Sequence, residues 1–195
     1  TIHSSRRRFA ARLNSGVRWH VKDPEVVEFI RSQLFALTLS ATAQRSNLYQ
    51  RDLPEDVRRV FQRSLRRSLE RIAHKYDATT SDEDHCKNIA SIAYHMSELH
   101  GEILCHGGMR IGHAQKCLNL YLKYLWVFDL GPEPPHFPVD AIILQFIPGF
   151  RNVRWTQMNS LDQYVSIVSA AKLEADKANL SLPQWELHCY NRRAT

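Results

Sequence analysis

Residues 106–116 read HGGMRIGHAQK and connect two segments whose apolar residues follow helical spacing. Three of these residues are glycines, which permit a tight turn and a close approach of other backbone. Backbone N–H groups that converge at the start of a helix attract anions, and a nucleic-acid phosphate is one such anion. The stretch therefore predicts a basic helical hairpin with a phosphate site, while an ordinary turn between two helices would share its composition.

The whole chain has the hydrophobic pattern of an all-α protein. Apolar residues recur at helical spacing along most of its length, and the sustained alternation typical of strands is absent. Capping residues and prolines predict where the helices begin. We expect helices over residues 24–39, 54–72, 81–104, 112–128, 160–179 and 181–191, and a short helix that starts at Val139-Asp140 and ends before Pro148. Together they form a single helical domain over residues 1–195, with a basic N-terminal segment over 1–22.

The chain carries more positive than negative charge. Its 195 residues include 26 Lys and Arg against 20 Asp and Glu, which gives a formal net charge of +6. Such an excess favours an acidic partner, above all nucleic acid, although a membrane surface or an acidic protein exerts the same attraction. Two groups carry much of the excess: Arg6, Arg7, Arg8, Arg12 and Arg18 near the start, and Arg58, Arg59, Arg63, Arg66, Arg67 and Arg71 further along.

The cysteines and the hydropathy exclude several other classes of protein. Cys86, Cys105, Cys117 and Cys189 form no CxxC pair, so the ligand spacing of a zinc site or an iron–sulfur cluster is missing. We therefore expect reduced thiols, no metal and no other cofactor. No apolar run is long enough to cross a membrane, and the arginine-rich start lacks the apolar stretch of a signal peptide. These features predict a cytoplasmic protein.

Two charged residues on either side of the proline-rich connector, residues 131–138, are expected to meet. Lys116 lies near the start of the helix over 112–128, where the helix dipole and partial burial disfavour an ammonium ion, and a neutral amine is a nucleophile. That helix measures about 25 Å. The connector contains four prolines and spans a similar length when extended. The chain can therefore return Asp140 to the side of Lys116.

The same region carries a family resemblance. The run GGMRIGHAQKCLNLYLKYLW, followed by PPHFPVDAII, resembles the helix-hairpin-helix DNA glycosylases of the endonuclease III and 8-oxoguanine glycosylase superfamily, and most of all their archaeal 8-oxoguanine branch. An earlier segment, ALTLSATAQRSN at residues 36–47, is similar to the end of an early helix in that family. The resemblance covers residues 24–147. It assigns the hairpin, the catalytic helix and the proline-rich return to residues 105–147.

The resemblance implies a fold and an activity. The fold is an all-α bundle of about seven helices or more, in one or two lobes around a cleft. The activity is that of a monomeric DNA N-glycosylase, which flips a modified base out of double-stranded DNA and excises it. The implied substrate is an oxidised purine or a bulkier modified base such as that of phage DNA. Repair and defence are both compatible with this activity, as are excision with and without strand cleavage.

The resemblance also assigns roles to individual residues. It implies that Lys116 attacks C1′ of the deoxyribose and that the Asp140 carboxylate stabilises the positive charge on the sugar. It implies that Leu120 and Trp185 line the base pocket, although a tryptophan is more often a core residue. The residues implied to contact DNA are Gly107, Gly108, Met109, Arg110, Gly112 and His113.

Two other functions fit parts of the sequence. Arg67 and His74 lie seven residues apart on one predicted helix and match the Arg-x6-His pattern of HEPN ribonucleases, although such a match is common in an arginine-rich segment. A helical DNA-binding module without catalysis would use the hairpin for phosphates alone. Replacing Lys116 or Asp140, and separately Arg67 or His74, distinguishes the three functions.

Overall fold

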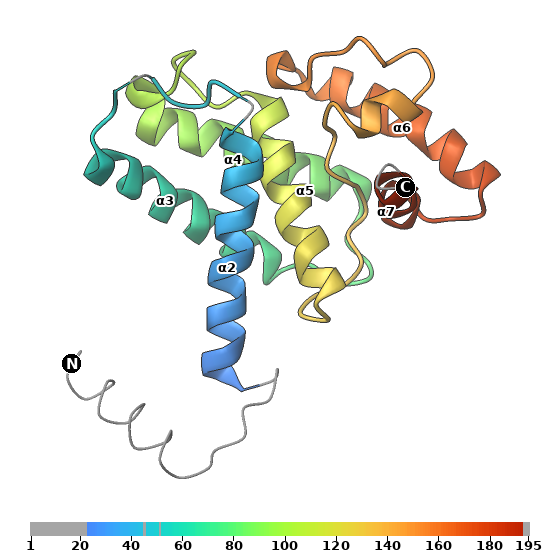
Figure 1. The fold of residues 1–195 in the computed structure, drawn as a ribbon, viewed down its shortest axis with the longest axis horizontal. Coiled ribbons are helices and arrows are strands. Elements are labelled where there is room, and N and C mark those ends of the chain that lie inside the picture. The colour runs from blue at the N-terminus through green and yellow to red at the C-terminus, as the bar shows by residue number, and fades with distance from the viewer. Residues whose placement is uncertain (1–22, 45, 51, 193–195) are drawn as a thin grey trace. The chain divides into compact units, whose positions relative to one another are not determined.

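The computed structural model describes residues 23–44, 46–50 and 52–192, and this part of the chain is all-α, as predicted (Figure 1). No β-strand forms within these ranges, where an isolated bridge pairs Tyr49 with Leu104. The basic segment over 1–22 lies outside the described residues. The α-helices are α2 (Pro24–Ala43), α3 (Glu55–Ala73), α4 (Asp82–His100), α5 (Ile111–Val127), α6 (Leu161–Lys177) and α7 (Leu182–Arg192). Short 3-10 turns are η1 (Gly101–Ile103), η2 (Ile143–Phe146) and η3 (Trp155–Gln157).

The chain divides into two compact units, Thr1–Gln33 and Leu34–Thr195. All of the predicted site residues belong to the second unit, which is described by itself below. None of the described helices is both long and apolar enough to cross a membrane. Over the same described ranges, no three His, Cys, Asp or Glu side chains are grouped as a metal site requires.

Helices begin where the capping chemistry of the sequence predicts. The Ser81 hydroxyl accepts a hydrogen bond from the N–H of Asp84 at 3.1 Å, and the Ser160 hydroxyl accepts one from the N–H of Gln163 at 3.2 Å. Each serine thereby satisfies a backbone donor that has no partner within its helix, α4 or α6. Pro24 is the first residue of α2, a position at which proline loses no hydrogen bond.

α5 is the central helix of the second unit. All of its residues from Gly112 to Lys123 are buried, and it packs against α3, α4, α6 and η3 (Figure 1). A helix that is covered on every side carries its polar side chains into the interior. Each of these side chains then needs a partner, because a buried polar group without a hydrogen bond costs free energy.

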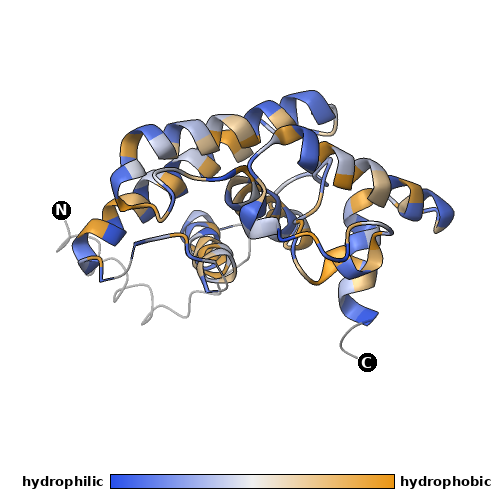
Figure 2. Ribbon diagram, turned by 90° about the horizontal axis from the view of Figure 1, so that it is seen from above, coloured by the Kyte–Doolittle hydropathy of each residue, from blue (hydrophilic) through white to orange (hydrophobic). Residues whose placement is uncertain are grey.

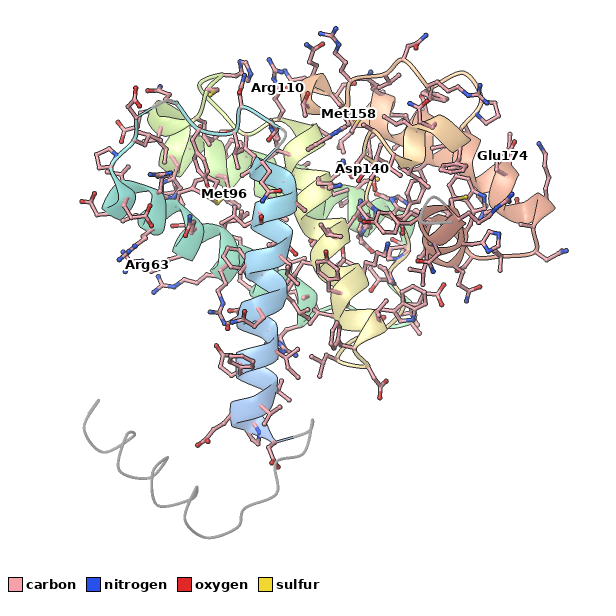
Figure 3. All side chains as sticks on the ribbon, in the orientation of Figure 1. Arg63, Met96, Arg110, Asp140, Met158 and Glu174 are labelled. Atoms are coloured by element: carbon pink, nitrogen blue, oxygen red, sulfur yellow. The ribbon has the colours of Figure 1, made fainter. Side chains whose placement is uncertain are left out.

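α3 has the opposite character and is strongly amphipathic. Phe61, Leu65 and Leu69 lie at helical spacing and are fully buried. Hydrophilic residues cover the other side of the helix, where Arg63 points away from the core (Figures 2 and 3). Much of the arginine cluster seen in the sequence is therefore a solvated helix face.

The proline-rich connector is free of helix, as predicted, and leads to η2. The predicted short helix from Val139-Asp140 to Pro148 is wrong in type and length, since only the 3-10 turn η2 forms there. Prolines close this segment on both sides, and a 3-10 turn satisfies its backbone groups over fewer residues than an α-helix does.

Candidate active site

Lys116 and Asp140 meet in the second unit, as the lengths of the helix and the connector predict. The Lys116 Nζ donates a hydrogen bond to the Asp140 Oδ2, and the two residues are 24 positions apart in the sequence. The side chain of Lys116 is 7% exposed and that of Asp140 is 18% exposed. An amine and a carboxylate thus face each other in a site that is largely shielded from solvent.

The other oxygen of Asp140 is held by backbone. Its Oδ1 accepts hydrogen bonds from the N–H groups of Ile142 at 2.9 Å and Ile143 at 3.1 Å. Asp140 therefore caps the start of η2 with one oxygen and faces Lys116 with the other. The backbone bonds fix the rotation of the carboxylate, so Oδ2 keeps its direction when the partner of Oδ2 changes.

Gln115 fixes the connector to α5, a role that the sequence analysis missed. Its Nε2 donates to the carbonyl oxygen of Val139 at 2.7 Å, and its Oε1 accepts from the N–H of Val139 at 3.0 Å. This two-pronged pairing holds the residue before Asp140 against the residue before Lys116. A glutamine within the predicted helix over 112–128 was the available signal, but the sequence alone does not name its partner.

The start of α5 differs slightly from the prediction. The helix begins at Ile111, which places Lys116 in its second turn rather than its first. The dipole effect is concentrated in the first turn, so burial and Asp140 matter more for this amine than the helix terminus does. The Lys116 Nζ also lies 5.4 Å from the centre of the Trp155 ring, within reach of a cation–π contact.

The two side chains line a pocket of about 440 Å³, named here the Lys116 pocket. Leu120, which was predicted to line a base pocket, lines the Lys116 pocket. Trp185 does not: it is 5% exposed and packs against Phe137, with ring centroids 5.9 Å apart, so its prediction as a pocket residue is wrong. Trp155 supplies an aromatic wall instead.

A second buried ion pair lies in the Lys116 pocket. The Lys123 Nζ donates to the Glu186 Oε2, and the two side chains are 9% and 5% exposed. Burial raises the pKa of Glu186, while the ammonium of Lys123 opposes this rise. Neither residue was predicted, because they are 63 positions apart and belong to different helices.

In the hairpin turn, residues 107–113, several backbone N–H groups are already hydrogen-bonded to other parts of the protein. The N–H groups of Gly107, Met109 and Gly112 donate to the Leu104 carbonyl oxygen, the Ser97 hydroxyl and the Met158 carbonyl oxygen, at 3.1, 2.8 and 2.9 Å. Figure 3 shows Arg110 and Met158 near this end of α5. These three N–H groups are not available to a phosphate. The prediction of a backbone phosphate site is therefore wrong for these three residues.

At two of the hairpin glycines, the local geometry explains why the residue is glycine. Gly107 has a φ of +69°, in the left-handed region that a side chain disfavours. At Gly112, a Cβ atom would come within 1.8 Å of the Trp155 carbonyl oxygen, so only glycine lets α5 pack this closely on η3. The close packing at Gly112 thereby keeps Trp155 beside Lys116.

His113 is buried, whereas its predicted DNA-binding role requires a side chain that reaches a ligand at the surface. It is 2% exposed, and neither ring nitrogen has a hydrogen-bond partner among the described residues. Burial lowers the pKa of His113 to about 4, helped by the nearby Arg110 and His106. Its ring packs edge-on against Trp155, with centroids 5.9 Å apart.

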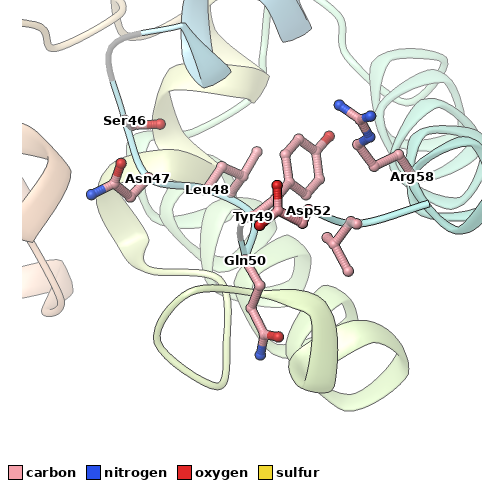
Figure 4. A pocket seen from close by; sticks show the side chains of 8 residues that line it. Ser46, Asn47, Leu48, Tyr49, Gln50, Asp52 and Arg58 are labelled. Carbon is pink, nitrogen blue, oxygen red and sulfur yellow. The ribbon is translucent and has the colours of Figure 1, made fainter. Parts of the chain in front are cut away.

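Polar pockets flank the hairpin turn. One of about 200 Å³ is lined by Asn47, His106, Arg110, His113, Thr156 and Gln157. A second, of about 290 Å³, shares His106 and Arg110 and also includes Gly107, Gly108 and Met109. Among the described residues, no acidic side chain lines either of them. Asn47 also borders a third pocket of about 370 Å³, beside Tyr49 and Arg58 (Figure 4).

A buried polar network extends from Gln115 toward α4. The Asn119 Nδ2 donates to the Gln115 Oε1 at 3.2 Å and to the Tyr164 hydroxyl at 2.9 Å. That hydroxyl in turn lies 2.9 Å from the His136 Nδ1, and the His136 ring contacts the His85 ring at 4.6 Å between centroids. The network connects α5 and α6 with the connector and the start of α4.

The residues of the ribonuclease alternative lie elsewhere. Arg67 and His74 are both exposed on α3 and at its C-terminal end, and neither lines the Lys116 pocket. The four cysteines are free thiols.

No family model matches this sequence, and comparison with curated proteins and with solved structures gives no match either.

Proposed function

We propose that the protein is a DNA glycosylase of the helix-hairpin-helix type, which removes a modified base from double-stranded DNA. The observation that carries this proposal is the hydrogen bond between the Lys116 amine and the Asp140 carboxylate inside the Lys116 pocket. The pocket volume, about 440 Å³, falls within the range of about 300–1,000 Å³ that small-molecule sites occupy. An extruded nucleoside belongs to that size class.

The reaction breaks two bonds to C1′, forms one bond to Lys116 and needs two proton transfers. In the resting site Lys116 is an ammonium ion paired with the Asp140 carboxylate. As the bond between C1′ and the base breaks, its electron pair leaves with the base, which takes a proton from Lys116. The Asp140 carboxylate stabilises the positive charge on the sugar. The Lys116 amine then adds to C1′. The bond between C1′ and the ring oxygen breaks, the ring oxygen takes a proton from the added nitrogen, and a Schiff base remains.

The surroundings of the pair support this division of roles. Backbone N–H groups hold the Asp140 Oδ1, so the Oδ2 stays directed at the reacting centre after Lys116 has moved toward C1′. Trp155 and Leu120 provide surfaces on which a flipped base packs. Because backbone holds the Asp140 Oδ1 before the base enters, the carboxylate needs little reorganisation during the reaction.

Side chains rather than backbone amides supply the contacts with DNA phosphates. Arg110 and His106 line both polar pockets beside the hairpin turn, and none of the described residues that line these pockets is acidic. The Arg110 Nη1 donates to the Thr156 carbonyl oxygen at 3.1 Å, which orients the guanidinium next to these pockets. Such contacts position the duplex without recognising its sequence.

Borohydride trapping tests the proposal. The full chain is incubated with duplexes that contain 8-oxoguanine, hypoxanthine, uracil or 5-hydroxymethyluracil, and borohydride then reduces any Schiff base to a stable adduct. We expect an adduct with at least one duplex, on the peptide that contains Lys116. Lys116→Ala should abolish it, whereas Lys87→Ala, at an exposed lysine of α4, should not.

Two results would overturn the proposal. One is the absence of an adduct and of free base with every duplex, even though the protein binds DNA, which would identify a binding module. The other is an adduct that persists in Lys116→Ala. Ribonuclease activity that disappears in Arg67→Ala or His74→Ala would instead support the alternative on α3.

A further inference from the structure

The exposed face of α3 carries a row of basic side chains that the proposed reaction does not use. Every fourth residue from 59 to 75 is both basic and exposed. These residues are Arg59, Arg63, Arg67, Arg71 and Lys75, together named the α3 stripe. Residues four positions apart lie on one side of a helix, about 6 Å apart along its axis. The four arginines therefore form a continuous row of about 18 Å, and Lys75 lies just beyond the end of the helix.

Most of the α3 stripe has no acidic partner. Arg59 pairs with Glu55 at 3.2 Å, but the other four members form no ion pair with any described residue. Glu70, the acid nearest to the middle of the stripe in the sequence, is bound by Arg66 instead. Like charges four positions apart repel each other and destabilise a helix. Stability of the fold therefore does not explain why these positions are basic.

The α3 stripe is separate from the site of the proposed reaction. None of its members lines the Lys116 pocket or either polar pocket beside the hairpin turn. Figure 3 shows Arg63 pointing outward at one edge of the second unit, while Arg110 lies at a different edge. The stripe is thus a second basic surface rather than a continuation of the one at the hairpin turn.

The surroundings of the α3 stripe favour a nucleic acid over other acidic partners. A helix that binds a membrane surface turns its apolar side toward the lipid, whereas Phe61, Leu65 and Leu69 of α3 are fully buried in the core. A protein interface has an apolar centre, and Val60 is the only large apolar side chain that α3 exposes. Single-stranded nucleic acids are bound by aromatic side chains that stack on the bases, and α3 exposes none. A double-stranded nucleic acid fits the remaining requirements.

We propose that the α3 stripe binds the phosphate backbone of a second DNA duplex, in addition to the DNA at the hairpin turn. The guanidinium group of arginine can donate two parallel hydrogen bonds to one phosphate. Each strand of B-DNA has one phosphate per about 3.4 Å, so a row of about 18 Å matches the length of about five base pairs. Such contacts do not depend on the base sequence. The choice of DNA over double-stranded RNA rests on the proposed function.

Two backbone-binding surfaces on one chain have a consequence for how the protein moves on DNA. While the hairpin turn holds one segment, the α3 stripe meets a neighbouring segment at a raised effective concentration. The chain can therefore pass from one segment to another without dissociating into free solution.

Counting the duplexes bound per chain tests this inference without catalysis. Sedimentation velocity follows a fluorescent, unmodified duplex of about 12 base pairs with the full chain at about 50 mM salt. The stripe variant R63Q/R67Q/R71Q should bind one duplex fewer than the parent. At about 200 mM salt the parent should bind that additional duplex about 40-fold more weakly, because three phosphate contacts give a slope of about −2.7 in log affinity against log salt.

The matched control is K87Q/K172Q/K177Q, which removes three exposed cations from α4 and α6 and has the same net charge as the stripe variant. It should bind as many duplexes as the parent. R63K/R67K/R71K keeps the charge of the stripe and should restore the additional duplex. Because glutamine suits an exposed helix position and removes the repulsion, the stripe variant should melt no lower than the parent.

Equal duplex counts for the parent and the stripe variant would overturn the inference. An equal loss in the control would do so too, because the net charge alone would then explain the binding. Stripe-dependent association with phosphatidylserine vesicles at an unchanged duplex count would identify a membrane surface instead. If the stripe variant melts below the parent, Arg63→Gln carries the test and should lower the salt slope by about one. A parent that needs the stripe for its additional duplex but forms no Schiff base contradicts the glycosylase proposal alone.

Discussion

Gln115 shows how one buried side chain can set the geometry of the proposed catalytic pair through backbone hydrogen bonds. It hydrogen-bonds both backbone groups of Val139 and sits next to Lys116 in the sequence. A carboxylate that is misplaced by about 1 Å can cost on the order of a hundredfold in rate. We therefore regard Gln115 as a positioning residue for Asp140.

Gln115→Leu should lower kcat by about tenfold to a hundredfold and leave KM nearly unchanged, because it disturbs Asp140 rather than the pocket walls. It should also reduce the free energy of unfolding by about 2–4 kcal/mol, since two backbone groups of Val139 lose their partners. Single-turnover trapping and urea unfolding measure the two effects. Gln145→Leu, at an exposed glutamine of η2, is the matched control. Equal losses in both variants would contradict the positioning role.

Gly112→Ala should destabilise the protein by about 3 kcal/mol, because the new Cβ would meet the Trp155 carbonyl oxygen at 1.8 Å. The displacement of Trp155 should also reduce Schiff-base formation. The control is Gly131→Ala, whose Cβ would lie 3.3 Å from the Cβ of Leu125, so we expect a loss below about 1 kcal/mol. Thermal unfolding and trapping compare the two variants, and similar melting temperatures would show that η3 moves freely.

At the scale of helices and turns, buried histidines occupy the junctions between elements. Burial lowers the pKa of His85 to about 3 and that of His136 to about 4, and it lowers the pKa of His113 to about 4. In the unfolded chain a histidine titrates near 6.5. The unfolded state therefore binds more protons than the folded state between these values, and stability falls as the pH falls through this window.

His113→Phe should make stability less sensitive to acid. Each buried histidine contributes a slope of up to about 1.4 kcal/mol per pH unit between pH 6.5 and its own folded pKa. Removing His113, whose ring nitrogens have no hydrogen-bond partner among the described residues, should lower the total slope by about that amount between pH 6 and 4.5. Urea unfolding at several pH values gives the slope. Parallel curves for the parent and the variant would contradict the assignment.

The same scale shows what the sequence predicts well. Most of the long helices lie within a few residues of their predicted bounds, because Ser81, Ser160 and the prolines act through contacts a few positions away. The meeting of Lys116 and Asp140 also follows from local quantities, a helix length and an extended connector. Features that depend on neighbouring residues are thus within reach of pattern analysis.

The remaining parts of the site depend on packing between distant segments. Trp155 rather than Trp185 reaches the pocket because Gly112 allows η3 to pack closely against α5. The residues next to each tryptophan in the sequence do not reveal this packing. Glu186 reaches Lys123 only through the docking of α7 near η2. Helical periodicity predicts that a residue is buried, but it does not predict what the residue contacts.

At the scale of the whole molecule, the net charge of +6 means that the proposed DNA binding should weaken as salt is added. Arg110→Gln should reduce the slope of log affinity against log salt by about one and leave the trapping rate at saturating DNA unchanged. Lys87→Gln, at a lysine that pairs with Glu83 on α4, should leave the slope as it is. Fluorescence anisotropy with a duplex at several salt concentrations measures both. An unchanged slope for Arg110→Gln would place the DNA away from the hairpin.

The bond between Gln115 and the backbone of Val139 also bears on how this protein can change over generations. Because it hydrogen-bonds backbone, the glutamine places no demand on the side chain at 139, which is restricted only by the packing around the buried Val139. Any shortening or lengthening between 115 and 139, by contrast, would separate the amine from the acid. Natural variants should therefore accumulate insertions outside this interval and keep its length constant.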